Sequence, residues 1–465
     1  MLETIFKAYD VRATYPDPLN EEAAWKVGCA TGRFLQQTSD ADGESAHPAT
    51  VVVGRDMRPS SPSMTEACIE GLRAAGLNVI DLGEIDTSFI YFAVNHVGAV
   101  GGIQVTASHN PPNYNGLKIS GREAKPIGAT TGLKEIQAIA ETLGGRGSIA
   151  PTGTLQQRDL WEPYRAHVRN FLKPFARTLK VVIDASNGMA AKMAPKVFEG
   201  VKNLDIVPLN FDYQSGTFAH PPNPLVPANM KATQQAVREH KADLGACFDG
   251  DADRCMLTDQ RGDVIGCDHL TALFAKYFLA ESPAQAIVYD LRSSKAVEET
   301  IRSLGGKPQR SRVGHVFLKA ALRETKGVFG GELSGHFYFR DNFCADSGAI
   351  ALAVTLSILG ASSSAMSELI APYKRYPQSG ELNFIVADKQ AVIQALKDKF
   401  ADAAEIDELD GVTIDAFKSA GWWFNVRASN TEPLLRLNAE GKTRPALDGV
   451  LRQIKPMLGE QAEGH

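Results

Sequence analysis

The chain has 465 residues, of which 44% are hydrophobic and 22% are charged, and its formal net charge is −5. This composition is that of an ordinary globular protein, and the length predicts about three or four domains. The lack of a basic excess argues against a nucleic-acid partner, because no surplus of cations exists to neutralise phosphates.

Cysteine usage and hydropathy indicate a cytoplasmic protein. The six cysteines are scattered and form no C-x-x-C pair, which argues against structural zinc and favours reduced, buried thiols. The first residues, MLETIFKAYDV, lack the basic and then apolar segments of a secretory signal. The apolar stretch 350–359 is too short to span a bilayer, so it predicts a buried helix and no membrane partner.

The chain begins with an amphipathic helix, predicted over 21–37, and continues with a recurring strand–turn–helix unit. Short β-branched runs that end in a polar turn and lead into helical sequence occur at 51–53, 181–184 and 287–290. This pattern is typical of βα units with buried, mostly parallel strands. Each unit has a second strand and loop downstream, at 101–111, 242–254 and 327–336. Because open α/β sheets bind ligands beyond the carboxyl ends of their strands, we expect these loops to meet in one cleft.

Turn-rich segments divide the chain. The segment 144–154 is rich in glycine, 259–263 is typical of a hairpin turn, and 371–380 precedes alternating segments at 381–388 and 422–429 that predict antiparallel strands. The predicted fold class is α/β, with three similar α/β domains of mixed, mostly parallel sheets and a smaller C-terminal α+β domain. We place these domains at 1–150, 151–260, 261–373 and 374–465.

Three aspartates occupy alternate positions directly after a predicted strand, at Asp249, Asp251 and Asp253. In a strand they would share one face and repel each other, whereas in a loop they can converge on a hard cation that prefers oxygen ligands. An EF-hand fits poorly, because Arg254 and Gln260 stand where that loop needs Gly and Glu. The alternative is a solvated acidic turn, but Arg254 and the preceding apolar run favour a metal site.

The segment TASHNPP (106–112) is a candidate nucleophile loop. Ser108 offers a hydroxyl for covalent catalysis or phosphate transfer beside His109, and two prolines prevent a helix from continuing. The alternative is a polar turn whose side chains bond to the backbone. Lys118, on the next predicted strand, is suited to reach back as a proton-transfer group or a cation. The sequence contains neither a G-x-S-x-G elbow nor a P-loop.

Two further segments carry groups that bind sugars and phosphates. GELSGH (331–336) places Glu332 and Ser334 between glycines, where they can bond to sugar hydroxyls. The segment RASNTEP (427–433) offers the Arg427 guanidinium, two hydroxyls and an amide, a good combination for phosphate. The alternatives are a glycine-rich turn and a solvated strand edge.

Six segments, taken in this order, resemble motifs of the alpha-D-phosphohexomutase superfamily, phosphomannomutase/phosphoglucomutase type: YDVR (9–12), TASHNPP (106–112), NGLK (115–118), DGDADR (249–254), GELSGH (331–336) and RASNTEP (427–433). The resemblance covers essentially the whole chain. It implies four domains around a deep cleft, and an enzyme that interconverts the 1-phosphate and 6-phosphate of mannose or glucose. It also implies a phosphoserine, one Mg²⁺ per chain, a bound hexose 1,6-bisphosphate, a phosphosugar as partner, and a monomer or weak homodimer.

The resemblance assigns roles to residues at the matching positions. Ser108 would be the phosphoserine, and its phosphate would share the Mg²⁺ with Asp249, Asp251 and Asp253. Lys118 or His109 would take part in proton transfer, and Arg254 would lie beside the phosphate. Substrate contacts would come from Tyr9, Arg12, Arg292, His315, Glu332, Ser334, His336, Arg427, Ser429, Asn430 and Thr431.

The sequence departs from the family pattern in three places. Ala13 stands where Gly often follows the first motif, Asp86-Thr87-Ser88 replaces a common Thr-Pro pair, and Asp346-Ser347 replaces a pair of acids. These changes bear on substrate preference. The apolar Leu333 disfavours the phosphoglucosamine mutase subgroup, which usually carries Gln there. That mutase, a phosphosugar phosphatase and a non-catalytic sugar-phosphate binder remain the alternatives.

Overall fold

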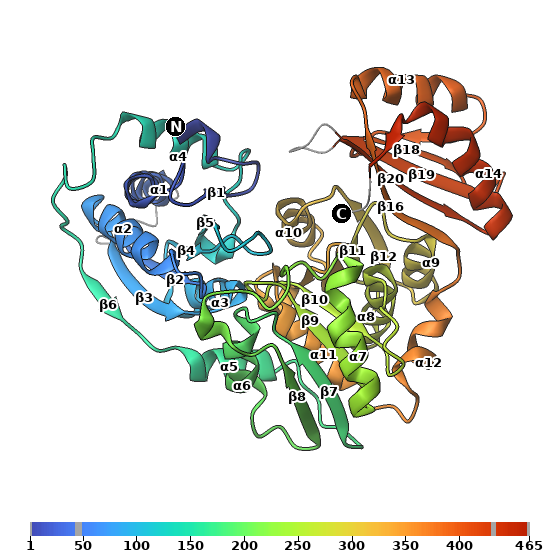
Figure 1. Cartoon of the computed structure of the whole chain (residues 1–465), viewed down its shortest axis with the longest axis horizontal. Helices are drawn as coiled ribbons and strands as arrows, with labels where there is room; N and C mark the ends of the chain where they lie inside the picture. The colour runs from blue at the N-terminus through green and yellow to red at the C-terminus, as the bar shows by residue number, and fades with distance from the viewer. Residues whose placement is uncertain (1, 42–48, 429–433, 463–465) are drawn as a thin grey trace. The chain divides into compact units, whose positions relative to one another are not determined.

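A computed structural model describes residues 2–41, 49–428 and 434–462 of the chain. The chain divides into two compact units, which are coloured by residue number in Figure 1. The first unit comprises Met1–Ile265 and Ser334–Ser367, and the second comprises Gly266–Leu333 and Glu368–His465. Within the described ranges, no helix combines the length and the hydropathy needed to cross a membrane.

The first sheet of the first unit is mixed, with parallel strands at its centre. Its order is β1-β5-β4-β2-β3-β6, formed by β1 (Val11–Thr14), β2 (Thr50–Arg55), β3 (Asn78–Glu84), β4 (Gly101–Val105), β5 (Tyr114–Gly121) and β6 (Leu155–Gln157). The strands β4, β2, β3 and β6 run parallel, whereas β5 is antiparallel to both of its neighbours, β4 and β1. Because β6 pairs with β3, this sheet continues past residue 150, the predicted first boundary. The division into four domains stays a prediction.

Helices cover both faces of this sheet. They are α1 (Glu21–Ala41), α2 (Ser61–Ala74), α3 (Thr87–Val97) and α4 (Leu133–Thr142). Gly101 and Gly102 of β4 let helices on opposite faces approach closely, because a Cβ on Gly101 would meet Leu35 of α1 and one on Gly102 would meet Val94 of α3. Figure 1 shows α1 and α2 beside each other. The helix predicted over 21–37 is confirmed and extends to Ala41.

The second sheet of the first unit has the order β10-β9-β7-β8. It contains β7 (Leu179–Asp184), β8 (Leu204–Leu209), β9 (Leu244–Phe248) and β10 (Cys255–Thr258), with helices α5 (Trp161–Arg169), α6 (Ala190–Phe198) and α7 (Lys231–His240). The β-branched run of β7 lies in the interior of the sheet, parallel to β8 and β9. The predicted hairpin turn is confirmed, since Gly262 N donates to Asp259 O at 2.9 Å.

The part of the first unit after residue 333 adds an antiparallel ladder and a buried helix. The ladder pairs β14 (Phe337–Phe339) with β15 (Ala345–Asp346), and helix α11 (Gly348–Gly360) follows. All but one of the residues of α11 are buried and none of them is charged, so the prediction of a buried helix at 350–359 is confirmed.

The second unit contains a parallel sheet and an antiparallel sheet. The first part consists of α8 (Cys267–Glu281), β11 (Ala286–Asp290), α9 (Lys295–Ser303), β12 (Lys307–Ser311), α10 (His315–Glu324) and β13 (Phe329–Gly331). Here β11 lies parallel to both β12 and β13. Helix α12 (Met366–Ile370) leads into the C-terminal part.

The C-terminal part is α+β, as predicted. Its sheet has the order β17-β18-β19-β20-β16-β21 and is antiparallel throughout. The elements are β16 (Gln378–Ile385), α13 (Lys389–Phe400), β17 (Glu405–Asp407), β18 (Val412–Ala416), β19 (Trp422–Ala428), β20 (Leu434–Gly441), α14 (Arg444–Ile454) and β21 (Glu460–Gln461). The α/β fold class with mixed, mostly parallel sheets and an α+β C-terminal part is therefore confirmed.

The close packing of α1 against α2 gives a test of the fold. A Cβ added at Gly71 of α2 would lie 2.1 Å from the Trp25 carbonyl oxygen of α1. We expect Gly71→Ala to lower the free energy of unfolding by roughly 1–3 kcal/mol, because one helix must shift. The control is Gly449→Ala in α14, where a Cβ meets nothing within 4 Å and should not destabilise. Urea denaturation measures both, and equal behaviour of the two variants would contradict this packing.

Candidate functional site

The loop after β4 holds Ser108 in an unusual backbone conformation. Ser108 is buried and has a φ of 49°, in the left-handed region that a residue with a Cβ adopts at a cost. Its N–H donates to Thr106 Oγ1 at 3.0 Å, and the Thr106 hydroxyl donates to Asp56 Oδ2 at 2.7 Å. The surrounding structure therefore determines the conformation of the serine.

Arg58 fixes the rest of this loop. Its guanidinium pairs with Asp56 at 3.0 Å, and both side chains are wholly buried. The five N–H donors of an arginine lie in a rigid plane, so they can serve several acceptors at once. Arg58 donates to four loop carbonyls: Ser108 at 2.9 Å, Asn110 at 2.8 Å, Pro111 at 2.5 Å and Tyr114 at 3.1 Å. Arg58 belongs to no motif recognised in the sequence, although a pair of charges flanking Met57 after a buried strand was a signal.

The three aspartates of the loop after β9 converge beside Ser108. Ligand oxygens of Asp249, Asp251 and Asp253 lie within 4.8 Å of one another, and all three residues are buried. The Ser108 hydroxyl donates to Asp249 Oδ2 at 2.8 Å. Gly250 makes this approach possible, because a Cβ there would lie 2.4 Å from the Ser108 carbonyl oxygen. The structure thus brings the predicted nucleophile and the predicted metal ligands together.

Two cations contact the acidic loop. Lys118 of β5 places Nζ 2.7 Å from Asp251 Oδ2 and 2.6 Å from Asp253 Oδ2. Arg254 Nε lies 3.6 Å from Asp249 Oδ2. Burial favours the neutral lysine, but the carboxylates outweigh burial and raise the pKa of Lys118. Lys118 therefore carries a positive charge at neutral pH.

The pKa values of two of these carboxylates are strongly shifted. Burial, together with the charges of Asp253 and Asp251, raises the pKa of Asp249 well above its usual range. Burial also opposes ionisation of Asp253, but Lys118 and His336 outweigh it and hold the Asp253 pKa well below its usual range. Such opposite shifts among neighbouring acids are typical of functional sites.

The donor set of this loop fits a magnesium ion. Mg²⁺ prefers hard oxygen ligands, and three carboxylates supply them here. The Oδ1 atom of Asp251 is buried and accepts no hydrogen bond within the described ranges. A buried carboxylate oxygen that lacks a donor is costly unless a cation binds it. Asp249, Asp251 and Asp253 are therefore the residues that would hold the ion.

His109 and Arg12 also contact the serine loop. His109 Nδ1 is 3.3 Å from Ser108 Oγ, and burial together with Arg254, Arg12 and Lys118 holds the His109 pKa well below its usual range. The imidazole is therefore neutral at neutral pH and able to accept a proton. Arg12 of β1 donates to Asn110 Oδ1 at 2.8 Å, and the half-buried Tyr9 lies in the bend before β1.

The GELSGH segment is divided between the two units. Ser334 and His336 belong to the first unit, where Ser334 Oγ lies 2.9 Å from His336 Nδ1. His336 Nε2 lies 3.4 Å from Asp253 Oδ1 and 3.6 Å from Asp346 Oδ2. His336, which the resemblance assigned to the substrate, therefore lies against the acidic loop. Asp346 was noted in the sequence only as part of a departure from the family pattern.

The departure at 86–88 also supports the acidic loop. Thr87, at the start of α3, donates its hydroxyl to Asp251 Oδ2 at 2.5 Å and its N–H to the Asp251 carbonyl at 3.0 Å. The neighbouring Asp86 is buried and accepts from the Tyr164 hydroxyl at 2.8 Å, and burial raises the Asp86 pKa to about 7. Thr87 therefore orients one of the candidate metal ligands, a role that the residue type alone did not indicate.

In the second unit, three arginines gather on one glutamate. Glu381 of β16 lies 3.0 Å from Arg292, 3.4 Å from Arg427 and 3.4 Å from Arg436. Burial favours neutral Glu381, but these arginines outweigh it and lower the Glu381 pKa. The arrangement concentrates positive charge in the way that an anion site requires. Arg436 and Glu381 were not among the predicted site residues, because neither belongs to a recognised motif.

The remaining predicted residues of the second unit lie around the same strands or outside the described ranges. Arg292 follows β11, pairs with Asp290 at 2.5 Å and lies 3.9 Å from Glu332 after β13. His315 is half-buried at the start of α10. Ser429, Asn430 and Thr431 lie outside the residues that the structure describes.

Comparison with known proteins covers nearly the entire chain. Sequence models of the phosphoglucomutase/phosphomannomutase alpha/beta/alpha domains I, II and III match residues 3–145, 162–262 and 267–376, and the model of the C-terminal domain matches 381–456. The chain is 38% identical over 453 residues to a phosphomannomutase of Vibrio cholerae, with 96% of each chain covered. It is 36% identical over 471 residues to a phosphomannomutase of Escherichia coli K12, covering 98% of this chain and 99% of that one. A crystal structure of a phosphoglucomutase/phosphomannomutase family protein from Burkholderia thailandensis has 31% identity and a TM-score of 0.87, over 98% and 97% of the two chains.

The buried Asp86 gives a pH-dependent test of this environment. Its folded-state pKa of about 7 exceeds the ordinary value of 3.8, so the folded protein loses stability as pH rises from about 4 to about 7. Asparagine cannot ionise. We therefore expect Asp86→Asn to gain roughly 2–4 kcal/mol relative to the natural protein between pH 4.5 and pH 8. Denaturation at both pH values measures the difference.

The control is Asp388→Asn, which changes an exposed aspartate at the N-terminus of α13. Its difference in stability from the natural protein should not change with pH. A pH-independent difference for Asp86→Asn would contradict the burial of an ionisable carboxyl beside the acidic loop.

Proposed function

This chain belongs to the phosphoglucomutase/phosphomannomutase family, and we propose that it interconverts the 1-phosphate and 6-phosphate of mannose or glucose. The observation that carries the proposal is the 2.8 Å hydrogen bond from the Ser108 hydroxyl to Asp249, beside two further converging carboxylates. A hydroxyl in that position is suited to carry a phosphoryl group, and the acidic loop is suited to hold Mg²⁺. We place the enzyme in the cytoplasm, as a monomer or weak homodimer.

The reaction consists of two phosphoryl transfers. Phosphorylated Ser108 gives its phosphoryl group to the free hydroxyl of a hexose monophosphate, which forms hexose 1,6-bisphosphate and leaves a serine hydroxyl. The bisphosphate then turns over and returns its other phosphoryl group to Ser108. The product is the isomeric monophosphate, and the enzyme regains its phosphoserine.

Charge governs both transfers. A serine phosphate near −2 and three carboxylates place about −5 in one buried region, which needs compensating cations. When Mg²⁺ is bound, it withdraws charge from the phosphoryl oxygens and leaves about −3. Arg254 and Lys118 supply positive charge, and preorganised charges of this kind are what phosphoryl transfer mainly requires from a protein.

Protons move through His109 in this proposal. Its neutral ring lies 3.3 Å from Ser108 Oγ, so it can take the proton when the hydroxyl turns from Asp249 and attacks, and return it when the serine leaves. Lys118 was expected to act as a proton-transfer group or a cation. Its raised pKa and its contacts with Asp251 and Asp253 favour the role of a fixed cation.

The phosphate that does not react binds to the second unit. Arg292, Arg427 and Arg436 gather on Glu381, and a phosphate brought to them gains bidentate hydrogen bonds. This site must accept the phosphate from either end of the sugar, because the bisphosphate turns over between the two transfers. We assign the remaining substrate contacts to Tyr9, Arg12, His315, Glu332, Ser334, Ser429, Asn430 and Thr431.

Removing one charge from the acidic loop tests the mechanism. We expect Asp251→Asn to lower kcat by at least about a thousandfold, because one metal ligand and one of the two ion pairs of Lys118 are both lost. The assay supplies mannose 1-phosphate or glucose 1-phosphate with Mg²⁺ and a trace of hexose 1,6-bisphosphate. The matched control is Asp263→Asn, which changes an exposed aspartate in the nearby hairpin turn and should keep full activity.

Undiminished activity of Asp251→Asn would contradict the role of the acidic loop. Glucosamine 1-phosphate turnover equal to or faster than that of mannose and glucose 1-phosphates would contradict the subgroup. Release of inorganic phosphate without isomer formation would identify a phosphatase instead.

A further inference from the structure

A loop of the second sheet packs on the turn that carries Arg58. This loop spans residues 210–230, between β8 and α7, and contains the short 3-10 helices η3 (Tyr213–Ser215) and η4 (Pro227–Met230). A Cβ at Gly216 would lie 3.0 Å from Pro59 Cγ, so the loop rests directly on that turn. The ring of Phe218 lies over the Arg58 guanidinium, and Arg58 Cζ is 5.0 Å from the ring centroid. The same ring lies beside Gly250 of the acidic loop, since a Cβ at Gly250 would come within 3.0 Å of it.

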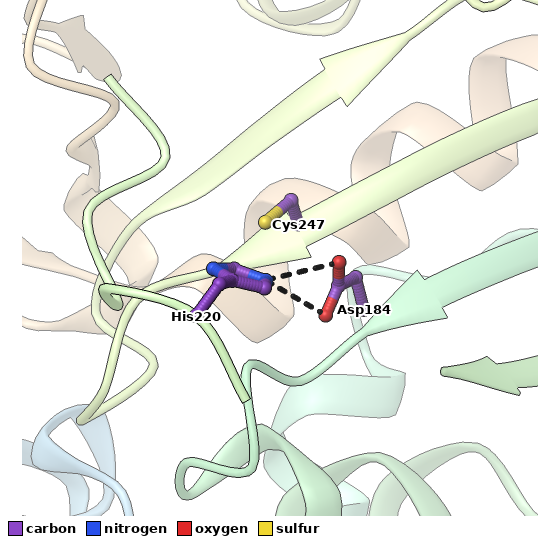
Figure 2. A group of neighbouring side chains, drawn as sticks. All are labelled: Asp184, His220 and Cys247. Carbon is purple, nitrogen blue, oxygen red and sulfur yellow. Dashed lines mark hydrogen bonds and ion pairs between the residues drawn. The ribbon is translucent and has the colours of Figure 1, made fainter. Parts of the chain in front are cut away.

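His220 anchors this loop to the end of β7. Figure 2 shows its ring directed at both carboxylate oxygens of Asp184, with Nε2 3.3 Å and 3.4 Å away. The other ring nitrogen, Nδ1, lies 3.0 Å from the Pro221 carbonyl oxygen. Both nitrogens face acceptors, so both bonds form only when the ring carries two protons. Burial opposes that charge, but Asp184 and the Pro221 carbonyl outweigh it and raise the His220 pKa.

The neighbouring Cys247 makes this group resemble a metal site, since Asp184, His220 and Cys247 have ligand atoms within 4.8 Å of one another. The hydrogen bonds favour an anchor instead. Asp184 already accepts from Ser186 N at 3.0 Å, Asn210 Nδ2 at 2.9 Å and Thr233 Oγ1 at 2.8 Å, in addition to His220. A carboxylate with this many donors has little capacity left for a cation.

We propose that Phe218 is a positioning residue for Ser108, and that the His220–Asp184 pair holds Phe218 in place. The ring attracts the guanidinium electrostatically and shields one of its faces from water. Arg58 then keeps its donors on the four carbonyls of the serine loop, and Ser108 keeps its left-handed conformation. Without the ring, Arg58 gains water as a competing partner, and the serine loop samples positions in which Oγ is misaligned for phosphoryl transfer.

The first test asks whether positioning requires the aromatic ring of Phe218 or only a large apolar side chain. Phe218→Leu keeps an apolar side chain but loses the ring, whereas Phe218→Tyr keeps the ring. We expect Phe218→Leu to speed amide hydrogen exchange in a peptide covering residues 106–116, and to lower kcat roughly 10- to 100-fold. The KM for hexose 1-phosphate should stay within about twofold, because the assigned substrate contacts lie elsewhere. The Phe218→Tyr variant should behave like the natural protein in hydrogen exchange and in kcat.

The second test asks whether His220 acts through Phe218. We expect His220→Gln to produce the same changes in a smaller degree, and to add little when combined with Phe218→Leu. The control is His167→Gln, which removes another half-buried histidine of the first unit, bonded to Asn342 at 2.8 Å. That variant should leave exchange in 106–116 unchanged.

Either of two results in these tests would overturn the proposal, and a metal-binding result is a third: unchanged exchange in the Phe218→Leu variant, or fully additive effects of the two substitutions. Stoichiometric Zn²⁺ binding that is lost in Cys247→Ser would also overturn it, because the cluster would then be a metal site. The kinetic part rests on the proposed mutase function, but hydrogen exchange does not. Failure of the mutase assay in the natural protein is therefore distinguishable from failure of the positioning role.

Discussion

The structure depends on one buried contact, in which the Ser108 hydroxyl donates to Asp249 at 2.8 Å. The two residues come from loops of different sheets, and both are removed from solvent. Such a contact requires the two backbones to touch, which Gly250 allows because any Cβ there would collide with the Ser108 carbonyl. It also requires the serine loop to hold a conformation that serine does not prefer, which Arg58 and Asp56 enforce through a network of buried hydrogen bonds.

The electrostatic cost of this contact explains the residues that surround it. Three buried carboxylates repel one another, and burial alone would neutralise them. Lys118, Arg254 and His336 lie against them and keep part of the charge in place, while Thr87 fixes one oxygen of Asp251. The result is a preorganised acidic loop that suits a divalent cation and a phosphoryl group. These supporting contacts leave the Ser108 hydroxyl adjacent to the acidic oxygens.

The strands and helices that follow from local hydrophobic patterns were predictable from the sequence. The β-branched runs at 51–53, 181–184 and 287–290 became the strands β2, β7 and β11, because a buried parallel strand needs apolar residues on both faces. The apolar stretch at 350–359 became the buried helix α11, and residues 381–385 and 422–428 of the two alternating segments became strands of an antiparallel sheet. The motifs indicated which residue types the proposed chemistry would use.

The supporting residues were not predictable in the same way. Thr87 and Asp251 are 164 positions apart in the chain, and Arg58 and Ser108 are 50 apart, so no local spacing relates them. Glu381 and Arg436 lie on paired strands, where their role depends on which neighbours the sheet topology supplies. His336 belonged to a recognised motif, but the sequence did not indicate that its ring lies against Asp253.

The most direct measurement is the phosphorylation state of Ser108 during a reaction cycle. The protein is incubated with hexose 1,6-bisphosphate and Mg²⁺, and peptide mass spectrometry maps the phosphoryl group. Our account predicts one phosphoryl group, on Ser108, that is transferred to excess hexose monophosphate to form hexose 1,6-bisphosphate, and that returns with added bisphosphate. Catalytic turnover without any phosphoryl group on Ser108, or with the group on another residue, would contradict it.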